Sequence, residues 1–488
     1  MRVAYQAGVI RALAEFGLEF AHADGTSGGT INLAMLLSGL SPVEMCDRWR
    51  TLDVKHFASA MPLPEYLKPN QLLAMGDADG LVRKVFPHLG IDVEKINAAS
   101  GMQGTFNVCN YSRKTNEVIL HQEIDLDLLV AGVSLPIFMP PVAKGGDLYL
   151  DSVWIKDANL MEAVRRGADE LWLVWCIGNM RTYKRGFFNQ YVHMIELSAN
   201  GRLFEEFKQI SDINGRIATG EVVLGHTRPI RLHLVKPEYP LPLDPDFYLG
   251  RIDAVTLIAM GYADAKKYLA SMKPEGVELE PEITLMKDPI LGITFRETMT
   301  GRIIFGQTDP KAMQPSKTGN DSILAMHATI TIQDLDCFIA DPNHLGQLNG
   351  AIDYPPFGQN IPAKSGVFNL FSPTDQPTLK LMVYEMGFEH EGKDYYLAGR
   401  KEVRKDPVVD MWKETTTLYS QLHQGTDKSG PIVAAGVLSL GMTDLMKMIS
   451  TMHAINASSP VEATDAMMRF GRFFMGELWD TYFRKVKG

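Results

Sequence analysis

Residues 25–29 carry the pattern in this chain that most directly specifies chemistry, Gly25-Thr26-Ser27-Gly28-Gly29, which reads G-x-S-x-G. In this pattern the serine lies on a sharp turn between a strand and a helix, so its hydroxyl is presented as a nucleophile. Because the turn is strained and neighbouring backbone packs closely, we expect a Cβ at Gly25 or Gly29 to clash. The pattern therefore predicts a nucleophile elbow at residues 25–29, with Ser27 as the nucleophile.

A serine hydroxyl is a weak nucleophile at neutral pH and requires a base within hydrogen-bonding reach. None of the twelve histidines stands in a recognisable local pattern, and we interpret His22 as a strand residue near the site. Asp24, beside the elbow, is interpreted as a solvated or turn-capping carboxylate. Asp151 follows a short strand pattern at 147–150, and α/β folds place functional groups at such strand ends. These positions favour Asp151 as the base and leave a histidine triad as the alternative.

Apolar periodicity predicts that the first part of the chain alternates helices with short strands. Such alternation indicates a layered α/β domain, in which helices pack against the faces of a sheet. The helices are expected at 3–18, 28–37, 190–208 and 251–272, and the strands at 18–23, 105–110, 117–121, 147–150 and 171–177.

Strand patterns dominate after Lys273-Pro274-Glu275-Gly276, which we take as the boundary between a domain at 1–275 and a domain at 276–488. The runs on either side of His390-Glu391-Gly392-Lys393 form a predicted hairpin. The second domain is expected to be mainly antiparallel β and to be closed by C-terminal helices. Its strands are expected at 293–305, 323–332, 366–371, 379–388 and 395–403, and its helices at 443–454 and 461–482.

Composition indicates a globular chain of 488 residues with 45% hydrophobic residues and a net charge of −10. This charge argues against nucleic acid as a partner. The four cysteines are far apart and form no C-x-x-C pair, which favours a reducing compartment. No apolar run approaches the ~18 residues of a membrane-spanning helix, and charges at helical spacing near residue 1 argue against a signal peptide. We therefore expect a cytoplasmic location.

Four segments resemble the patatin-like phospholipases: AYQAGVIRAL at 4–13, GTSGGT at 25–30, SLPIFMPPV at 134–142 and LYLDSVWIKDANLMEAVRRGADELWLV at 148–174. They occur in that family's order and rough spacing, and the resemblance covers about residues 1–275. It implies a three-layer α/β/α domain that hydrolyses acyl esters of lipids through an acyl-enzyme, without a metal or cofactor. It also implies a catalytic dyad in which Ser27 is the nucleophile. Asp151 matches the aspartate of the family's D-G-[AG] motif and is the implied base.

Two features depart from the family's pattern. Ser152 stands where the family usually has glycine, which carries a penalty if that position requires a positive φ. Family members also open with a strand and a glycine-rich loop, roughly G-G-G-x-R-G, whose N–H groups stabilise the oxyanion. Here Met1, Arg2 and Val3 align with the end of that loop, and the strand before it is missing. Gly28 and Arg2 are the remaining candidates for stabilising the oxyanion and positioning the substrate. The chain is then either a shortened hydrolase, or a lipid-binding or assembly module without turnover.

The long insertions at 42–98 and 180–275 are helical and rich in methionine and aromatic residues, including Met45, Trp49 and Met75. Such side chains line adaptable apolar grooves, so we expect both insertions to cap Ser27 and to hold the acyl chain. The alternative is that they cover the faces of the sheet. A lipid or acyl ester is the expected partner, with transient contact at a membrane surface.

Three C-terminal segments resemble an accessory region attached to some cholesterol-oxidase-like oxidoreductases and some α/β hydrolases. They are DYYLAGRKEV at 394–403, KETTTLYSQLH at 413–423 and FGRFFMGELWDTYF at 470–483. The resemblance implies a module shared among lipid-handling enzymes. A structural domain that dimerises or covers the edge of the first domain is the alternative.

Overall fold

The computed structural model describes residues 2–53, 56–57, 73–183, 185–241, 253–288, 290–312, 321–376, 379–404, 415–457 and 460–482. Contacts divide the chain into two compact units, Met1–Asp288 and Pro289–Gly488. Within the described ranges, none of the helices has both the length and the apolar character needed to span a membrane. Parts of the predictions at 54–55, 58–72, 184, 242–252, 413–414 and 483 fall outside the described residues.

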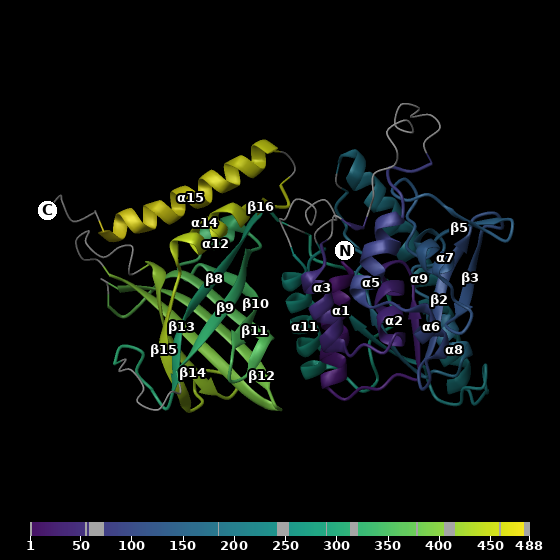
Figure 1. The fold of residues 1–488 in the computed structure, drawn as a ribbon, viewed down its shortest axis with the longest axis horizontal. Coiled ribbons are helices and arrows are strands. Elements are labelled where there is room, and N and C mark those ends of the chain that lie inside the picture. Colours follow the sequence, from purple (N-terminus) through teal and green to yellow (C-terminus); the bar gives the residue numbers. More distant parts are fainter. Residues whose placement is uncertain are drawn as a thin grey trace. The chain divides into compact units, whose positions relative to one another are not determined.

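The first unit has mixed α/β architecture, as the sequence predicts (Figure 1). Its helices are α1 (Val3–Glu15), α2 (Gly28–Leu37), α3 (Pro42–Thr51), η3 (Leu81–Val85), α5 (Phe86–Leu89), α6 (Val93–Ala98), α7 (Leu126–Ala131), η4 (Ser152–Trp154), α8 (Leu160–Arg165), α9 (Phe187–Ala218), α11 (Ala254–Ser271) and η5 (Pro281–Thr284). Its strands are β1 (His22–Gly25), β2 (Gln103–Asn110), β3 (Thr115–Leu120), β4 (Val142–Lys144), β5 (Asp147–Asp151), β6 (Glu170–Val174) and β7 (Arg231–Val235).

The strand β2 organises the main sheet of this unit. β3 pairs antiparallel with β2 from Thr105 to Asn110 and so covers one of its edges. β1 pairs parallel with β2 up to Phe106, and β5 pairs antiparallel from Asn110 back to Val108. Because β3 already occupies the opposite edge over these residues, β1 and β5 must share the remaining edge. They run toward each other along it, and both end where they meet.

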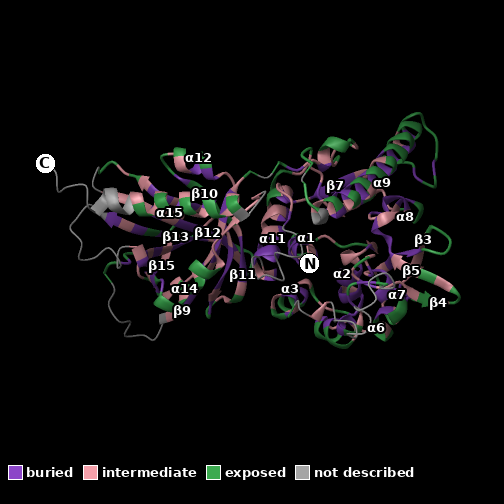
Figure 2. Ribbon diagram, turned by 90° about the horizontal axis from the view of Figure 1, so that it is seen from above, coloured by how far each residue is buried: buried purple, intermediate pink, exposed green. Residues whose placement is uncertain are grey.

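Two apolar clusters form the core of the first unit. One joins α1, α2, α3, α7 and α11 to β2, and the other joins α8 and α9 to the parallel pair β6 and β7. Figure 2 shows α1 mostly buried, whereas α9 carries buried and exposed residues along its length. α1 and α11 approach so closely that a Cβ built on Gly8 would lie 2.1 Å from the carbonyl oxygen of Ile258. A Cβ on Gly261 would lie 2.0 Å from the carbonyl oxygen of Tyr5. The two helices therefore pack backbone against backbone.

Over its described residues, the second unit forms a nine-stranded antiparallel sheet, which closes on itself because β15 pairs with β8. Its interior is packed with apolar side chains, and its C-terminal helices contact strands, which confirms a mainly antiparallel β domain with closing helices. Its elements are β8 (Gly292–Phe305), β9 (Asp321–Ile332), α12 (Leu335–Ala340), β10 (Leu345–Tyr354), β11 (Gly358–Pro373), β12 (Leu379–His390), β13 (Lys393–Arg404), β14 (Thr417–Gln424), β15 (Ile432–Ser439), α14 (Met442–Thr451), β16 (His453–Ile455) and α15 (Pro460–Tyr482).

The packing of α1 on α11 gives a stability prediction. Gly8→Ala should lower the free energy of unfolding by about 1–3 kcal/mol, because the new methyl group meets a backbone carbonyl that cannot rotate away. Gly215→Ala is the matched control, since that glycine is exposed on α9 and nothing lies within 4 Å of its Cβ position. The control should be neutral or stabilising by up to about 1 kcal/mol, because alanine favours helix over glycine. Chemical denaturation of both variants measures the difference, and equal effects would contradict the close approach.

Candidate active site

Ser27 lies at the turn between β1 and α2, as the G-x-S-x-G pattern predicts. Its backbone has φ 52° and ψ −127°, a sparsely populated region for a residue with a side chain. Strain of this kind persists only where the surrounding structure holds it, and it is typical of functional positions. The N–H of Gly28 is one of the first four in α2, and these have no partner inside the helix. The turn therefore presents a hydroxyl beside a backbone donor.

The three glycines of the elbow are constrained differently from our expectation. A Cβ on Gly25 would lie 3.0 Å from the carbonyl oxygen of Gly29, which is a tight contact as expected. The prediction was wrong for Gly29, because nothing lies within 4 Å of its Cβ position. The crowded position is Gly28, where a Cβ would lie 1.9 Å from Cγ1 of Val3 in α1. The glycine after the serine is thus required by the packing of α1.

The meeting of β1 and β5 brings Asp151 to Ser27. Gly25, at the end of β1, pairs with Phe106, and Asp151, at the end of β5, pairs with Val108 two residues further along β2. The backbone leaves the sheet after each strand, through the elbow after β1 and into η4 after β5. The side chains of Ser27 and Asp151 interact across the junction.

The Asp151 carboxyl is held in a desolvated pocket, with 1% of the residue exposed. Burial raises its pKa to about 7, while the contact with the Ser27 hydroxyl and the hydrogen bond from the Val153 N–H oppose the shift. Val153 N–H donates to Oδ1 at 2.9 Å. The other oxygen, Oδ2, is buried and makes no ordinary hydrogen bond to the described residues, so the contact to Ser27 is longer or less aligned than one. Nucleophile–base contacts of this kind often tighten only with substrate bound.

A second carboxyl group, on Asp157, was not anticipated from the sequence. It lines the same cavity as Ser27, and burial together with the charge of Asp151 raises its pKa to about 8. The loop that carries it is anchored by Lys156, whose Nζ lies 2.7 Å from Oε1 of Glu206. Asp157 lies six residues after Asp151, and this spacing matches no recognisable motif. Asp157 therefore joins Asp151 as a carboxyl group of the site whose pKa burial raises toward neutral pH.

His22 and Asp24 both lie on β1. His22 Nε2 shares a hydrogen bond with Oγ1 of Thr105 at 2.8 Å, and burial lowers its pKa to about 4, with a smaller contribution from Arg166. The interpretation of Asp24 as a solvated or turn-capping group was wrong. Its Oδ2 accepts from Thr105 Oγ1 at 2.5 Å and its Oδ1 from Asn107 Nδ2 at 2.6 Å, and burial raises its pKa to about 7.

Ser152 fits its position without backbone strain. It begins η4 and is absent from the described non-glycine residues with positive φ, so this site does not require the conformational freedom of glycine. The residue is fully buried, and its hydroxyl donates to Oδ1 of Asn116. The penalty expected for serine at this position is therefore not present.

A cavity of about 1490 Å³ opens onto Ser27, and Arg2 and Gly28 also line it. Its lining includes consecutive residues at 18–24, around β1, and at 170–177, around β6. Successive side chains of a strand point to opposite faces of the sheet. A cavity that touches every residue of a strand therefore lies along the edge of that strand. Among the described residues, β1 pairs only with β2, and β6 only with β7.

The two long insertions contribute to this cavity in part. Phe57 and Met75 from the first insertion and Tyr191 from the second line it. Met45 and Trp49, in contrast, are buried in the core beneath α1, so their expected place in the groove was wrong. Some side chains of the insertions therefore line the cavity, as expected for a groove, and others build the core, as expected if the insertions cover the sheet.

Comparison with known proteins gives a family match over the N-terminal region. Residues 1–164, which include Ser27 and Asp151, match the family model described as patatin-like phospholipase. The N-terminal region is patatin-like. Among solved structures, the crystal structure of VipD from Legionella pneumophila aligns with 12% identity and a TM-score of 0.29, over 55% of this chain and 65% of VipD. This TM-score supports no argument about fold, and the aligned part spans less than two thirds of VipD. The curated proteins give no match.

The buried carboxyl of the patatin-like region gives a second prediction. Folding raises the pKa of Asp151 from 3.8 to about 7, so the folded chain binds this proton more tightly than the unfolded chain. Its ionisation therefore costs stability progressively as the pH rises from about 4 to about 7, at about 1.4 kcal/mol per pKa unit. Asp151→Asn should raise the melting temperature at pH 8 and change it little at pH 4.

Asp147→Asn is the control for this comparison. Asp147 lies on the same strand, and its carboxylate pairs with Arg113 at 2.9 Å, so its amide variant should not be stabilised at pH 8. Calorimetry at both pH values measures the difference. A lower melting temperature for Asp151→Asn at pH 8 would contradict the desolvation of this carboxyl.

Proposed function

We propose that the chain is a serine acyl hydrolase that cleaves acyl esters of lipids with Ser27 as nucleophile and Asp151 as base. The observation that carries the proposal is the pairing of a strained serine with a buried carboxyl whose pKa is raised to about 7. A base is most effective when its pKa lies near the working pH. The patatin-like match at 1–164 and the cavity beside Ser27 support a lipid substrate.

The reaction follows from the positions of these groups. Ser27 Oγ attacks the ester carbonyl carbon, and its proton passes to the Asp151 carboxylate. The carbonyl oxygen becomes an oxyanion, for which the Gly28 N–H is the available backbone donor. Collapse of the tetrahedral intermediate breaks the bond to the alkoxide, which takes the proton back from Asp151. Water then attacks the acyl-enzyme, and Asp151 accepts its proton. Collapse of this second intermediate breaks the bond to Ser27 Oγ, which takes the proton back from Asp151 as the fatty acid leaves.

A histidine base is less well supported. His22 is hydrogen-bonded to Thr105, and its depressed pKa of about 4 makes it a weak base. A lipid-binding module without turnover is the second candidate, because one backbone donor at Gly28 gives limited stabilisation of an oxyanion. Loss of one oxyanion donor costs about 10²–10³ in kcat in other hydrolases. Labelling by an active-site probe separates the two candidates.

A fluorophosphonate probe should label the chain at Ser27, because it reacts with an activated serine and not with an ordinary exposed hydroxyl. Ser27→Ala should abolish the label and also the release of p-nitrophenol from p-nitrophenyl butyrate. Ser271→Ala is the control and should keep both, since its hydroxyl only contacts the backbone of its own helix. Mass spectrometry of the labelled peptide identifies the site. An unlabelled Ser27 in a folded chain would favour the lipid-binding module.

The pH dependence of turnover tests the base. Asp151 accepts a proton only when ionised, so kcat/KM should fall about tenfold per pH unit below the Asp151 pKa of about 7. Asp151→Asn should remove turnover at every pH, because nucleophile and base act as a unit. Rates measured from pH 5 to 9 on a neutral ester give the profile. A midpoint near 4, the range of an exposed carboxyl, would contradict the buried base.

A further inference from the structure

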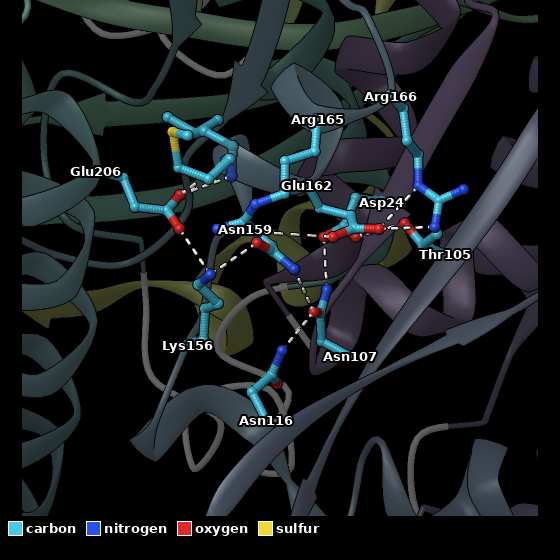
Figure 3. A network of polar contacts seen from close by, with 12 residues as sticks. Asp24, Thr105, Asn107, Asn116, Lys156, Asn159, Glu162, Arg165, Arg166 and Glu206 are labelled. Atoms are coloured by element: carbon cyan, nitrogen blue, oxygen red, sulfur yellow. Dashed lines mark hydrogen bonds and ion pairs between the residues drawn. The ribbon is translucent and has the colours of Figure 1, made fainter. Parts of the chain in front are cut away.

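A line of hydrogen bonds between side chains runs beside the point where β1 and β5 meet. It begins at Ser152, whose hydroxyl donates to Oδ1 of Asn116. Asn116 Nδ2 donates to Oδ1 of Asn107 at 2.9 Å, and Asn107 Nδ2 donates to Oδ1 of Asp24 at 2.6 Å. Figure 3 shows Asn107 between Asp24 on one side and Asn116 on the other. The line therefore joins the residue after Asp151 to the strand that ends at the elbow.

Asp24 sets the direction of every hydrogen bond in this line. Its Oδ1 accepts whether the group is ionised or carries a proton on Oδ2, where the Thr105 hydroxyl lies at 2.5 Å. Asn107 must therefore turn its NH₂ group toward Asp24, which leaves its oxygen facing Asn116. Asn116 must in turn direct its NH₂ group to Asn107 and its oxygen to Ser152. Only a hydroxyl or amide donor at residue 152 completes the line, and glycine or alanine there would leave the half-buried Asn116 oxygen without this donor.

The hydroxyl of Ser152 reaches the Asp151 carboxyl through the backbone. Ser152 is fully buried at the start of η4, and the next N–H, that of Val153, donates to Oδ1 of Asp151 at 2.9 Å. The main chain on the other side is fixed by the bond from Asp151 N–H to the carbonyl oxygen of Ser134 at 3.1 Å. A displacement of Ser152 therefore rotates the Val153 N–H and, with it, the carboxyl that it holds.

We propose that Ser152 is a positioning residue, which rests on the proposed function: through Asn116 and Asn107 its hydroxyl holds the Asp151 carboxyl in register with the strand that carries Ser27. The two strand ends share no backbone hydrogen bond with each other, because both lie along β2. Asn107 lies on β2 between their last partners, Phe106 and Val108. The side-chain line thus links two strand ends that otherwise meet only through their common partner β2.

The test compares Ser152→Ala, Asn116→Ala and the double variant. Each should lower kcat, and the rate constant for fluorophosphonate labelling of Ser27, by between about tenfold and a hundredfold, because small displacements of a catalytic group cost rate in this range. KM should change little, since neither side chain lines the cavity. The double variant should be no slower than either single variant, because both break the same line.

Asn110→Ala is the matched control. Asn110 is a buried asparagine on β2, next to the strand that carries Asn116, and it donates to Glu117 at 2.8 Å and Asp147 at 3.0 Å, outside the line from Ser152. Its loss should lower the melting temperature while leaving the labelling rate unchanged. An equal loss of labelling rate in the control, or effects that multiply in the double variant, would overturn the proposal.

A titration of the Asp151 carboxyl by ¹³C NMR gives a readout independent of turnover. The bond from Ser27 lowers the pKa of Asp151, so a carboxyl released from its register should titrate at higher pH in Ser152→Ala and Asn116→Ala. Asn110→Ala should leave the titration unchanged. If the unmodified chain shows neither labelling nor turnover, the proposed function fails, and this titration still decides the role of Ser152. An unmoved midpoint in both variants would overturn that role.

Discussion

The candidate site of the first unit depends on the removal of the Asp151 carboxyl from water beside Ser27. β1 and β5 run toward each other along one edge of β2, so both strands must end where they meet. The end of β1 leads into the strained backbone of Ser27, and the end of β5 buries Asp151 away from water. Burial makes the carboxyl a base near neutral pH, and the same burial costs stability when the group ionises. Reactivity and destabilisation therefore share one physical cause.

Local chemistry explains which parts of this arrangement could be predicted from the sequence. The elbow follows from five adjacent residues, and the hairpin of β12 and β13 follows from alternating strands around a short turn. The strands β10, β14 and β15 were missed, because small and polar residues interrupt their alternation. Closure of the sheet by β15 and β8 is a register between distant segments, which local periodicity does not encode.

The candidate site shows the same limit. Ser27 could be predicted from its own turn, and Asp151 from the end of its strand together with the family resemblance. The crowding at Gly28 comes from Val3 on another helix, and the raised pKa of Asp157 comes from burial, so neither was visible in the sequence. Asn107 and Asn116 lack any spacing pattern. Their role emerges only from the direction of hydrogen bonds that the Asp24 carboxyl imposes.

Closure of the second unit also determines when it can form during synthesis. The pairing of β8 with β15 joins Thr300 to Ser439 and Phe305 to Ala434. β8 therefore cannot complete its pairing until β15 has left the ribosome. Contacts between residues this far apart carry a large loop-closure cost and form slowly. The first unit precedes this whole stretch, and domains generally fold in the order of their synthesis. During that interval β8 exposes an unpaired edge, and such edges can pair with other chains, so the second unit is the part of the chain more open to aggregation during synthesis.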